Sequence, residues 1–308
     1  AWVAPPTLTL RKFGRQFPPS RWRHVSGAKF STAASSSLSE ALTYHSAWFC
    51  PFAHRCTIAL EHHHVPYTWN ESLGWTVRPT TVGEAGRTEE AAYHWKSPDL
   101  LAANPAGMVP TLVDPETGKV VKESLVTIEF VDDLASARGY ATPPLLPSDP
   151  FDRASARWWA QWVNAKCCSP YYSVLCKEDR ADQKEAFEGL VKNLRTFARE
   201  LDRQTGPFFG GATLSMVDVA LLPWALRFYV FPYYRGEAFA IPQDGELRTY
   251  HKWLQAAVEL PAVQSTRPDH DRYLEHIKKY ATNSARSKVA NAVRRGVSAH
   301  EYDDDKDG

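Results

Sequence analysis

One cysteine, placed between a strand-like run and a helix-like run, constrains this chain more than any other feature. Residues 48–55 read Trp-Phe-Cys-Pro-Phe-Ala-His-Arg, with Cys50 directly before Pro51. Proline is common at the first position of a helix, because the N–H that it lacks would have no partner there. A thiol at this end of a helix faces free N–H groups and the positive end of the helix dipole. We therefore expect Cys50 to be a nucleophile whose pKa lies below the ordinary value of about 8.5.

Cys50 is expected to work as a single thiol. A dithiol enzyme would place its second cysteine three residues further on, and that position is Ala53. Cys56 lies six residues along the predicted helix, a rise of about 9 Å, which exceeds the roughly 7 Å between Cα atoms that a disulfide can span. An external thiol must therefore resolve any mixed disulfide on Cys50, and Cys56 is expected in the core. The chain has five cysteines and no C-x-x-C pair, which favours reduced thiols and gives no support to a structural zinc site.

Two further motifs have the chemistry of a site for a peptide-like ligand. Residues 104–112 read Asn-Pro-Ala-Gly-Met-Val-Pro-Thr-Leu. This pattern does not by itself establish a cis bond before Pro110, but a cis bond would turn the backbone of Val109 outward as a strand edge for the ligand. Glu123 and Ser124 stand at a predicted helix start, where N–H groups and a hydroxyl can bind a carboxylate and Glu123 an ammonium. The alternative is a capping serine beside a solvated glutamate.

The predicted elements have the order of an α/β domain followed by a helical domain. Alternating or periodic apolar residues predict strands at 41–45, 67–69, 109–113 and 119–122, and helices at 51–64, 98–103 and 124–136. Residues about 74–95 contain Gly74, Pro79, Gly83 and Gly86 and have no clear period, so we interpret them as an inserted loop.

These elements predict five segments along the chain. Residues 41–137 form the first domain, 138–150 are a proline-rich linker, and 151–270 form an all-helical domain. Residues 271–308 read as a basic helix followed by an acidic tail. The first 40 residues hold six basic residues, seven serines and no acid before Glu40, which is the composition of an organellar transit peptide. We expect a mitochondrion rather than a plastid; the alternative is a docking arm on a cytoplasmic protein.

Charge and hydropathy exclude two classes of partner. The net charge of the whole chain is +1, which gives no general attraction to nucleic acid. No run of 18 apolar residues suggests a membrane-spanning helix.

His62, His63 and His64 are not expected to bind one metal ion, because successive residues on a helix point about 100° apart.

Together, the motifs resemble those of the glutathione transferases, and specifically the omega class. Omega-like proteins carry C-P-F-A-x-R, then N-P-x-G-x-V-P-x-L, then E-S, and all three stand here. Leu-Leu-Pro-Ser-Asp-Pro at 145–150 resembles the interdomain linker of the family. Phe-Phe-Gly-Gly at 208–211 with Ser-Met-Val-Asp at 215–218 resembles its folding motif, physically a capping box whose acidic position is Asp218. The residues Ala-His-Arg after Phe52 and the long insertion are similar to features of the xi class, the glutathionyl-hydroquinone reductases. Phe52 stands where those proteins carry a tryptophan.

This resemblance implies a thioredoxin-like N-terminal domain followed by an all-helical glutathione-transferase C-terminal domain, with glutathione as co-substrate and no metal. Cys50 would be the nucleophile. The implied glutathione-binding residues are Phe52, Lys96, Val109, Pro110, Glu123 and Ser124. The implied lining of a second-substrate pocket is Trp224, Arg227 and Phe228, with Arg195 a weaker candidate.

The implied function is that of a glutathione-dependent thiol transferase or reductase, acting on mixed disulfides, dehydroascorbate or S-glutathionyl adducts. Glutathionyl-hydroquinone reductase is the closest alternative. A non-catalytic subunit of this fold, docked in a larger assembly by its terminal extensions, is the alternative of another class. The family also implies a homodimer.

Overall fold

The computed structural model describes residues 41–82 and 87–302, without the side chains of residues 81–88. The predicted targeting or docking arm of residues 1–40 lies outside the described residues, as does the acidic end of the chain beyond residue 302.

The first domain is built on a four-stranded sheet. Its strands are β1 (Leu42–Ser46), β2 (Tyr67–Glu71), β5 (Thr111–Val113) and β6 (Val120–Lys122). They lie in the order β2-β1-β5-β6, with β1 and β2 parallel and the other two pairs antiparallel. Helix α2 (Pro51–His63) joins the parallel pair, because parallel neighbours need a crossover connection. The four predicted strands of this domain are confirmed to within two residues at each end.

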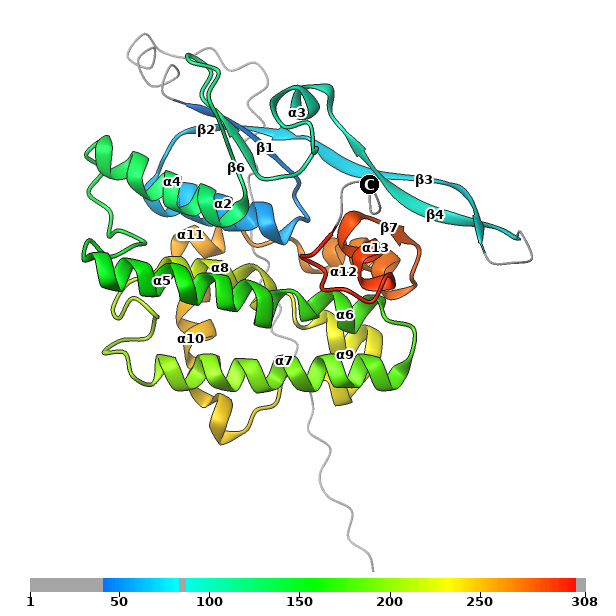
Figure 1. The fold of residues 1–308 in the computed structure, drawn as a ribbon. Coiled ribbons are helices and arrows are strands. Elements are labelled where there is room, and N and C mark those ends of the chain that lie inside the picture. Colours follow the sequence, from blue (N-terminus) through cyan, green and yellow to red (C-terminus); the bar gives the residue numbers. More distant parts are fainter. Residues whose placement is uncertain (1–40, 83–86, 303–308) are drawn as a thin grey trace, which may run out of the picture. The chain divides into compact units, whose positions relative to one another are not determined.

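Helices α2 and α4 (Ser124–Ala137) pack against each other and separate the sheet from the helical half (Figure 1). α3 (Pro98–Ala103) precedes β5 at the predicted position. Tyr44 of β1 is fully buried, and its hydroxyl donates to the carbonyl of Ala53, 2.6 Å away. A buried tyrosine hydroxyl needs such a partner, and this one holds the first turn of α2 against the sheet.

The segment between β2 and α3 is a long β-hairpin, so the interpretation of residues 74–95 as a loop is wrong. β3 (Leu73–Val82) and β4 (Arg87–Lys96) pair antiparallel along their whole length. Glycine and proline suggested a loop, but Pro79 lies on β3, an edge strand of a sheet in the order β3-β4-β7. Edge strands tolerate proline, since the N–H on the open side needs no partner in the ladder.

The second half of the chain is helical, as predicted. Its elements up to residue 264 are α5 (Pro150–Val163), η1 (Asn164–Cys168), α6 (Pro170–Cys176), α7 (Arg180–Leu201), α8 (Met216–Ala225), α9 (Val230–Arg235), η2 (Glu237–Phe239), η3 (Gly245–Leu247), α10 (Arg248–Val258) and α11 (Pro261–Gln264). Every residue of α8 is buried, and α8 contacts α2, α4, α5 and α10. An apolar helix buried on all sides forms the centre of such a core, and α8 joins the helical half to the first domain.

Helix α8 begins with the capping box expected from the sequence. The Ser215 hydroxyl accepts from the N–H groups of Val217 and Asp218, and the Asp218 carboxylate accepts from the N–H of Ser215, 2.7 Å away. The same carboxylate accepts from the N–H of Phe209 and from Nε1 of Trp253. One buried acid therefore fixes the start of α8, the preceding loop and α10.

The end of the described chain consists of two helices and a strand, and the single basic helix expected within residues 271–308 is not observed. α12 (His270–Ala281) is followed by β7 (Ala285–Arg286) and α13 (Lys288–Arg294). Asn283 interrupts the helix with a φ of 57°, a conformation that asparagine tolerates better than most residues. β7 then pairs in parallel with β4, and Figure 1 shows these orange and red elements beside the hairpin.

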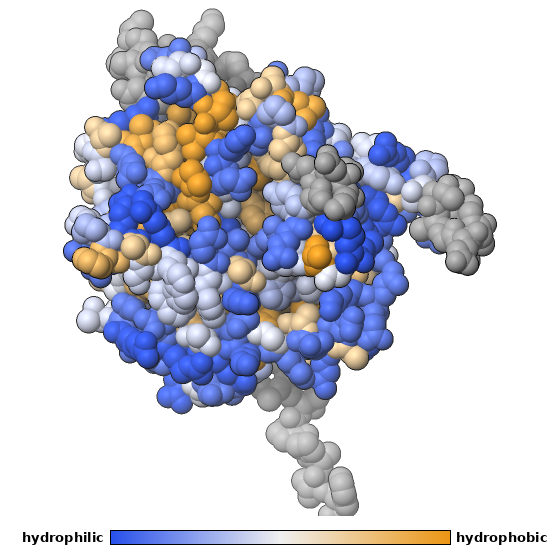
Figure 2. Space-filling model, viewed as in Figure 1, coloured by the Kyte–Doolittle hydropathy of each residue, from blue (hydrophilic) through white to orange (hydrophobic). Residues whose placement is uncertain are grey.

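Apolar side chains are exposed on one side of the first domain. Figure 2 shows them gathered over α4 and the neighbouring strands. Val126 of α4 is 53% exposed, and Phe151 of α5 is 85% exposed. Within the described ranges, no helix combines the length and the apolar character needed to cross a membrane.

Candidate active site

Cys50 is the N-cap residue of α2, as the sequence predicted. Its own N–H donates to the carbonyl of Ala47 at 2.9 Å, which closes a tight turn between β1 and α2. The backbone N–H groups of Phe52 and Ala53 favour the charged form of its sulfur and so lower the pKa of the thiol, although the thiol does not cap the helix through a hydrogen bond. The strand-turn-helix connection therefore aims a thiol at the free donors of the first helical turn.

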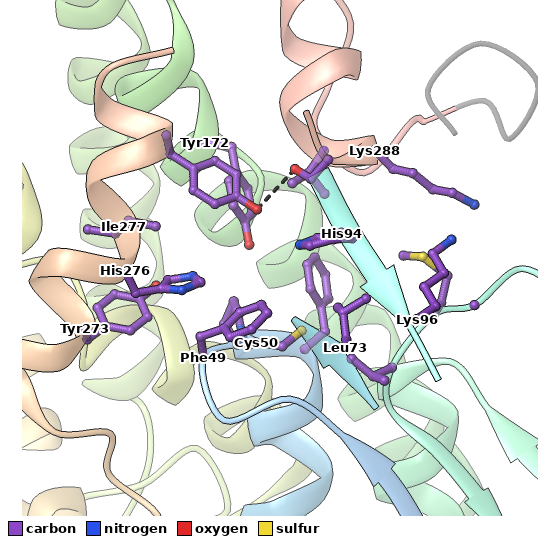
Figure 3. Close-up of a pocket in the computed structure, with 18 residues that line it drawn as sticks. Phe49, Cys50, Leu73, His94, Lys96, Tyr172, Tyr273, His276, Ile277 and Lys288 are labelled. Atoms are coloured by element: carbon purple, nitrogen blue, oxygen red, sulfur yellow. Dashed lines mark hydrogen bonds between the residues drawn. The ribbon is translucent and has the colours of Figure 1, made fainter. Parts of the chain in front are cut away.

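Cys50 opens onto a pocket shared by the first domain and the hairpin (Figure 3). Phe52 and the loop residues Gly107, Met108 and Val109 line it from the first domain. The hairpin contributes Leu73, His94 and Lys96. Four of the predicted site residues, Cys50, Phe52, Lys96 and Val109, therefore line one pocket.

The helical half closes the pocket with aromatic side chains. Tyr172 comes from α6, and α12 supplies Tyr273, His276 and Tyr280. The His276 ring stacks on Phe49, with ring centroids 4.1 Å apart. The chain after α12 adds Ser287, Lys288 and Val289. The first domain, the hairpin, α6 and the chain from α12 onward therefore all contribute to the surroundings of Cys50.

The prediction of a lowered pKa for Cys50 is wrong for this structure. Burial raises the pKa of the thiol above its ordinary value, and the N–H groups of Ala53 and Phe52 and the charges of Arg227 and Arg55 offset this only in part. Desolvation disfavours the charged form of an acid. The reasoning from helix geometry identified the stabilising donors but not the aromatic cover that removes water from the sulfur.

Two fully buried arginines contribute positive charge near Cys50. Arg55 of α2 donates to the carbonyl of Ala220 at 2.9 Å, to Ser124 Oγ at 3.0 Å and to Asn164 Oδ1 at 2.9 Å. Its Nη2 also donates to Cys168 Sγ at 3.3 Å, and burial raises the pKa of that thiol to about 12, so all four partners are neutral near pH 7. A buried charge is costly unless it is paired, and a nearby thiolate is a natural counter-charge.

Arg227 is the second buried arginine, and it was predicted to line the second-substrate pocket. It is fully buried and donates to the carbonyl of Pro223 at 2.6 Å. Its Nη1 lies 3.0 Å from His54 Nδ1, and its guanidinium lies 4.8 Å from the ring centroid of Tyr273. Arg227 therefore sits behind the wall of the pocket and acts on Cys50 through its charge.

Lys96 crosses the loop that carries Val109. Its Nζ donates to the carbonyl of Ala106, 3.1 Å away. Gly107 has a φ of +61°, and a Cβ there would lie 2.3 Å from Cδ of Lys96. Glycine is needed at this position both for its backbone conformation and for the space that the lysine occupies.

The bond between Val109 and Pro110 is cis. Val109 lines the pocket beside Cys50, and Pro110 is buried behind it. A strand-edge backbone at Val109 is the group that a peptide-like ligand would pair with.

Glu123 and Ser124 stand at the start of α4, as predicted, but they do not line the pocket around Cys50. Ser124 is buried and its hydroxyl accepts from Arg55. Glu123 is exposed and has a φ of 72°. The Ser124 hydroxyl is therefore already hydrogen-bonded within the protein, whereas Glu123 is exposed to solvent.

The residues predicted for the second substrate do not line the pocket that contains Cys50. Trp224 and Phe228 are buried in the core, and Phe52 packs edge-on against Trp224 with centroids 4.9 Å apart. Arg195 forms ion pairs with Asp244 and Glu246, each at 2.8 Å. None of the three lines the pocket that contains Cys50.

Several residues that cover Cys50 were missed in the sequence, although two signals were present. His94 lies two residues before the predicted Lys96 on β4, and residues two apart on a strand share a face. Tyr273, His276, Ile277 and Tyr280 have the i, i+3, i+4, i+7 spacing of one helical face. The pattern indicated a buried stripe, but it did not indicate which surface the stripe meets.

Two of the three successive histidines make contacts with the segment that follows α4 or with α4 itself. His63 lies 3.0 Å from the Asp132 carboxylate, and His62 Nε2 lies 2.9 Å from the carbonyl of Pro143. Asp132 also accepts from the N–H of Leu145, which ties the interdomain connection to α4. Among the described residues, no group of three or more His, Cys, Asp or Glu side chains is arranged to hold a metal ion.

Comparison with known proteins matches this arrangement to one family. Residues 49–134 match the model for the glutathione S-transferase N-terminal domain, and residues 156–256 match that for the C-terminal domain. The probable glutathione S-transferase parA of Nicotiana tabacum is 32% identical over 203 residues, 65% of this chain and 86% of the relative. Glutathione S-transferase U17 of Arabidopsis thaliana is 30% identical over 240 residues, 76% of this chain and 92% of the relative.

Solved structures of two classes share the fold. Glutathione transferase Omega 3C from Trametes versicolor aligns with a TM-score of 0.62 and 29% identity, covering 82% of this chain and 96% of that one. The Tau class enzyme from mango, Mangifera indica, aligns with a TM-score of 0.63 and 25% identity, covering 79% and 100%. The predicted thioredoxin-like and all-helical domains are thereby confirmed. The chain belongs to the glutathione S-transferase family, whose co-substrate is glutathione.

Proposed function

We propose that this protein is a glutathione-dependent thiol transferase or reductase, of the kind to which its omega-like motifs belong. The observation that supports this is a single cysteine at the amino end of α2, in one pocket with Val109 and Lys96. A serine or tyrosine at such a position uses the thiolate of glutathione itself, whereas a cysteine can form a disulfide with it. The expected reaction is therefore reduction rather than conjugation.

The reaction has two exchange steps. The Cys50 thiolate attacks the glutathione sulfur of a mixed disulfide; a new sulfur–sulfur bond forms and the substrate leaves as a thiolate. A second glutathione thiolate then attacks the glutathione sulfur on Cys50, so that oxidised glutathione leaves and the Cys50 thiolate is restored. Ala53 occupies the position of a resolving cysteine, which is why the second step needs an external thiol. Protein mixed disulfides and dehydroascorbate are the first substrates to test.

Glutathionyl-hydroquinone reductase is the second candidate, and the lining of the pocket favours it. Tyr172, Tyr273 and Tyr280 lie around Cys50 together with two histidines. Such a wall suits a planar aromatic ring that carries hydroxyl groups. Here the Cys50 thiolate would attack the sulfur of the adduct, the carbon–sulfur bond would break, and the ring carbon would take up a proton. Glutathione would then reduce the resulting mixed disulfide as before.

The decisive experiment compares the wild type with Cys50→Ser in the glutathione-dependent reduction of a small mixed disulfide. We expect turnover to vanish in Cys50→Ser and to persist in Cys176→Ala, which removes a buried cysteine elsewhere.

Because burial raises the pKa of Cys50, wild-type turnover should rise from pH 7 to pH 9. Equal turnover in wild type and Cys50→Ser would refute the mechanism. No turnover in a folded wild type would favour the non-catalytic subunit, and an S-glutathionyl hydroquinone assayed in parallel distinguishes the second candidate.

A homodimer is also part of the proposal. The exposed apolar residues Val126 on α4 and Phe151 and Trp158 on α5 support an interface on these helices. Sedimentation of the full chain, with Phe151→Glu as the disrupting variant, tests this. A monomeric wild type would contradict it.

An organellar location, in a mitochondrion rather than a plastid, remains a proposal that the composition of residues 1–40 supports. Imaging of the chain with and without residues 1–40 tests it. An unchanged distribution of the protein in the cell would favour a docking role for residues 1–40.

A further inference from the structure

The imidazole of His94 is a polar group on the pocket wall that has no role in the exchange steps described above. His94 lies on β4 and lines the same pocket as Cys50 (Figure 3). The centroid of its ring lies 3.9 Å from that of Trp75 and 6.1 Å from that of Phe49. Because Phe49 directly precedes Cys50 in the chain, the imidazole is packed against the turn that carries the nucleophile.

The strand that carries His94 is hydrogen-bonded on both sides. β3 pairs with β4 along its whole length and places Trp75 opposite His94. On the other side lies the C-terminal segment, which we define as residues 284–302. Its strand β7 places Ala285 opposite Ala92, and the N–H of Ala92 donates to the carbonyl of Ser284, 2.9 Å away. The His94 side chain therefore starts from a backbone fixed by two neighbours, as a precise site requires.

The His94 ring makes no hydrogen bond to any other described residue, and its Nε2 is shielded from solvent. Other buried histidines do have partners: His54 Nε2 lies 3.0 Å from Thr266 Oγ1, and His63 Nδ1 lies 2.6 Å from Thr142 Oγ1. A buried polar group without a partner is an exception that needs an explanation. The hydrogen-bonding capacity of the His94 imidazole is left for a molecule in the pocket.

His94 is neutral in the folded protein. Burial, together with the nearby charges of Lys96 and Lys279, lowers the pKa of His94 to about 3. A neutral imidazole carries one N–H donor. In a site that excludes water, such a donor stabilises an oxygen on which negative charge develops, and it keeps its proton while doing so. Exchange between sulfur atoms creates no such oxygen, so the donor implies a further substrate chemistry.

An S-glutathionyl ketone is an adduct in which such an oxygen appears. The Cys50 thiolate attacks the glutathione sulfur, a sulfur–sulfur bond forms, and the bond from that sulfur to the carbon beside the carbonyl breaks. The electron pair of the broken bond moves onto the carbonyl oxygen, so that an enolate leaves. The enolate carbon then takes up a proton from water, which gives the free ketone. Glutathione reduces the mixed disulfide on Cys50 as in the exchange described above.

We propose that His94 is a catalytic residue that donates a hydrogen bond to the enolate oxygen when Cys50 reduces an S-glutathionyl ketone. The inserted hairpin thereby favours adducts that carry a carbonyl beside the carbon–sulfur bond over plain disulfides. This inference rests on the proposed function, because it requires Cys50 to attack the sulfur of a glutathione adduct.

Steady-state kinetics of the full chain on two matched probes tests this role. S-phenacylglutathione releases an enolate, whereas the mixed disulfide of glutathione and 2-phenylethanethiol carries the same aromatic ring and releases only a thiolate. His94→Phe keeps a ring beside Trp75 and Phe49 but removes the donor. We expect it to lower kcat for S-phenacylglutathione about 100-fold with little change in KM, because the oxygen is charged only in the transition state. Turnover of the disulfide should stay within about twofold of the wild-type value.

Two further variants complete the test. His94→Gln keeps an N–H donor and should recover part of the kcat that His94→Phe loses. His251→Phe is the matched control, at a histidine of α10 that is half-buried like His94 but lies outside the pocket. It should change the turnover of neither probe.

Three outcomes in the variants would overturn the role of His94. One is an unchanged kcat of His94→Phe for S-phenacylglutathione. Another is an equal loss on both probes, which would mean that His94 only supports the packing around Cys50. The third is a change confined to KM, which would mean that the imidazole binds the substrate before charge develops on its oxygen.

The two probes also separate this inference from the proposed function. A wild type that reduces the disulfide but not S-phenacylglutathione would overturn the role of His94 and leave the thiol transferase reaction in place. A folded wild type that reduces neither probe would overturn both.

Discussion

At the scale of single residues, Cys50 shows how a correct inference about local geometry can predict the wrong direction for a pKa shift. The strand-Cys-Pro-helix order placed the thiol near the N–H groups of Phe52 and Ala53, which favour its charged form. That inference needed only residues close in sequence. The pKa depends also on Tyr172 and Tyr273, which come from far along the chain and remove water from the sulfur. Burial then outweighs the local donors.

Gly107 gives the sharpest test at the residue scale. Its φ is +61°, and a Cβ there would overlap the Lys96 side chain. We expect Gly107→Ala to lose about 1–2 kcal/mol of stability because of the left-handed backbone. It should also weaken glutathione binding, because Lys96 must move.

Gly118→Ala is the matched control for Gly107→Ala. Gly118 also has a positive φ, of +68°, but no atom lies within 4 Å of its added Cβ. Denaturant unfolding should show a similar loss of stability in both variants, and titration should show weaker glutathione binding only in Gly107→Ala. Equal affinities in the two variants would mean that the position of Lys96 does not matter for binding.

At the scale of elements, the sequence predicted those whose signals are local. α2, α3 and α4 and the four strands of the first sheet have clear periods and clear end signals. The hairpin was missed because Pro79 is normally a strand breaker, and its position on an edge strand could not be known before the sheet order. β7 was missed because two residues carry no periodic signal. Trp224 and Phe228 lie in the core and not in the pocket around Cys50, since a motif does not say which face of a buried segment meets a ligand.

The capping box of α8 is expected to be the element-scale contact with the largest effect on stability. Asp218 is fully buried and accepts from Phe209, Ser215 and Trp253. Asp218→Ala leaves these donors without an acceptor, so the free energy of unfolding should fall by about 3 kcal/mol. α8 also supplies the carbonyl of Ala220 to Arg55, so Cys50 reactivity should change as well.

Asp149→Ala is the comparison for the α8 variant. Asp149 caps α5 through the N–H groups of Phe151 and Asp152, but its donors are exposed to water. Its loss should cost about 1 kcal/mol. Urea unfolding of both variants gives the comparison, and a loss for Asp218→Ala no larger than that for Asp149→Ala would show that burial of the cap adds nothing.

At the scale of the whole molecule, the site is a product of contacts between distant parts of the chain. The first domain supplies Cys50, the inserted hairpin supplies His94, and the last helices supply His276 and Lys288. The two-domain fold could be predicted because the sequence motifs resemble those of the glutathione transferases. The closed pocket could not, since it depends on where the insertion and the C-terminal segment pack, and periodicity within each segment does not encode that.

The packing of these distant parts around Cys50 buries several neutral histidines. Their burial leads to a prediction about the stability of the protein in acid. Burial lowers the pKa of His94 to about 3 and that of His300 to about 3. Burial also lowers the pKa of His276 well below its ordinary value, and nearby cations including Lys279 lower it further. In the unfolded chain each histidine takes up a proton near pH 6.5, while in the folded chain it does not do so until a much lower pH. The unfolded state therefore binds more protons below pH 6.5.

The free energy of unfolding should accordingly fall as the pH drops from 6.5 towards 3, by about 1 kcal/mol per pH unit for each such histidine. His94→Gln should make this fall less steep, because one buried basic group is removed. His270→Gln, at a histidine whose side chain is 61% exposed, should leave the slope unchanged. Urea unfolding of the three proteins at a series of pH values from 7.5 to 5 gives the slopes. If His94→Gln and wild type lost stability in parallel, the neutral state of His94 would not contribute, and the closed packing around Cys50 would have to be looser than the contacts described above.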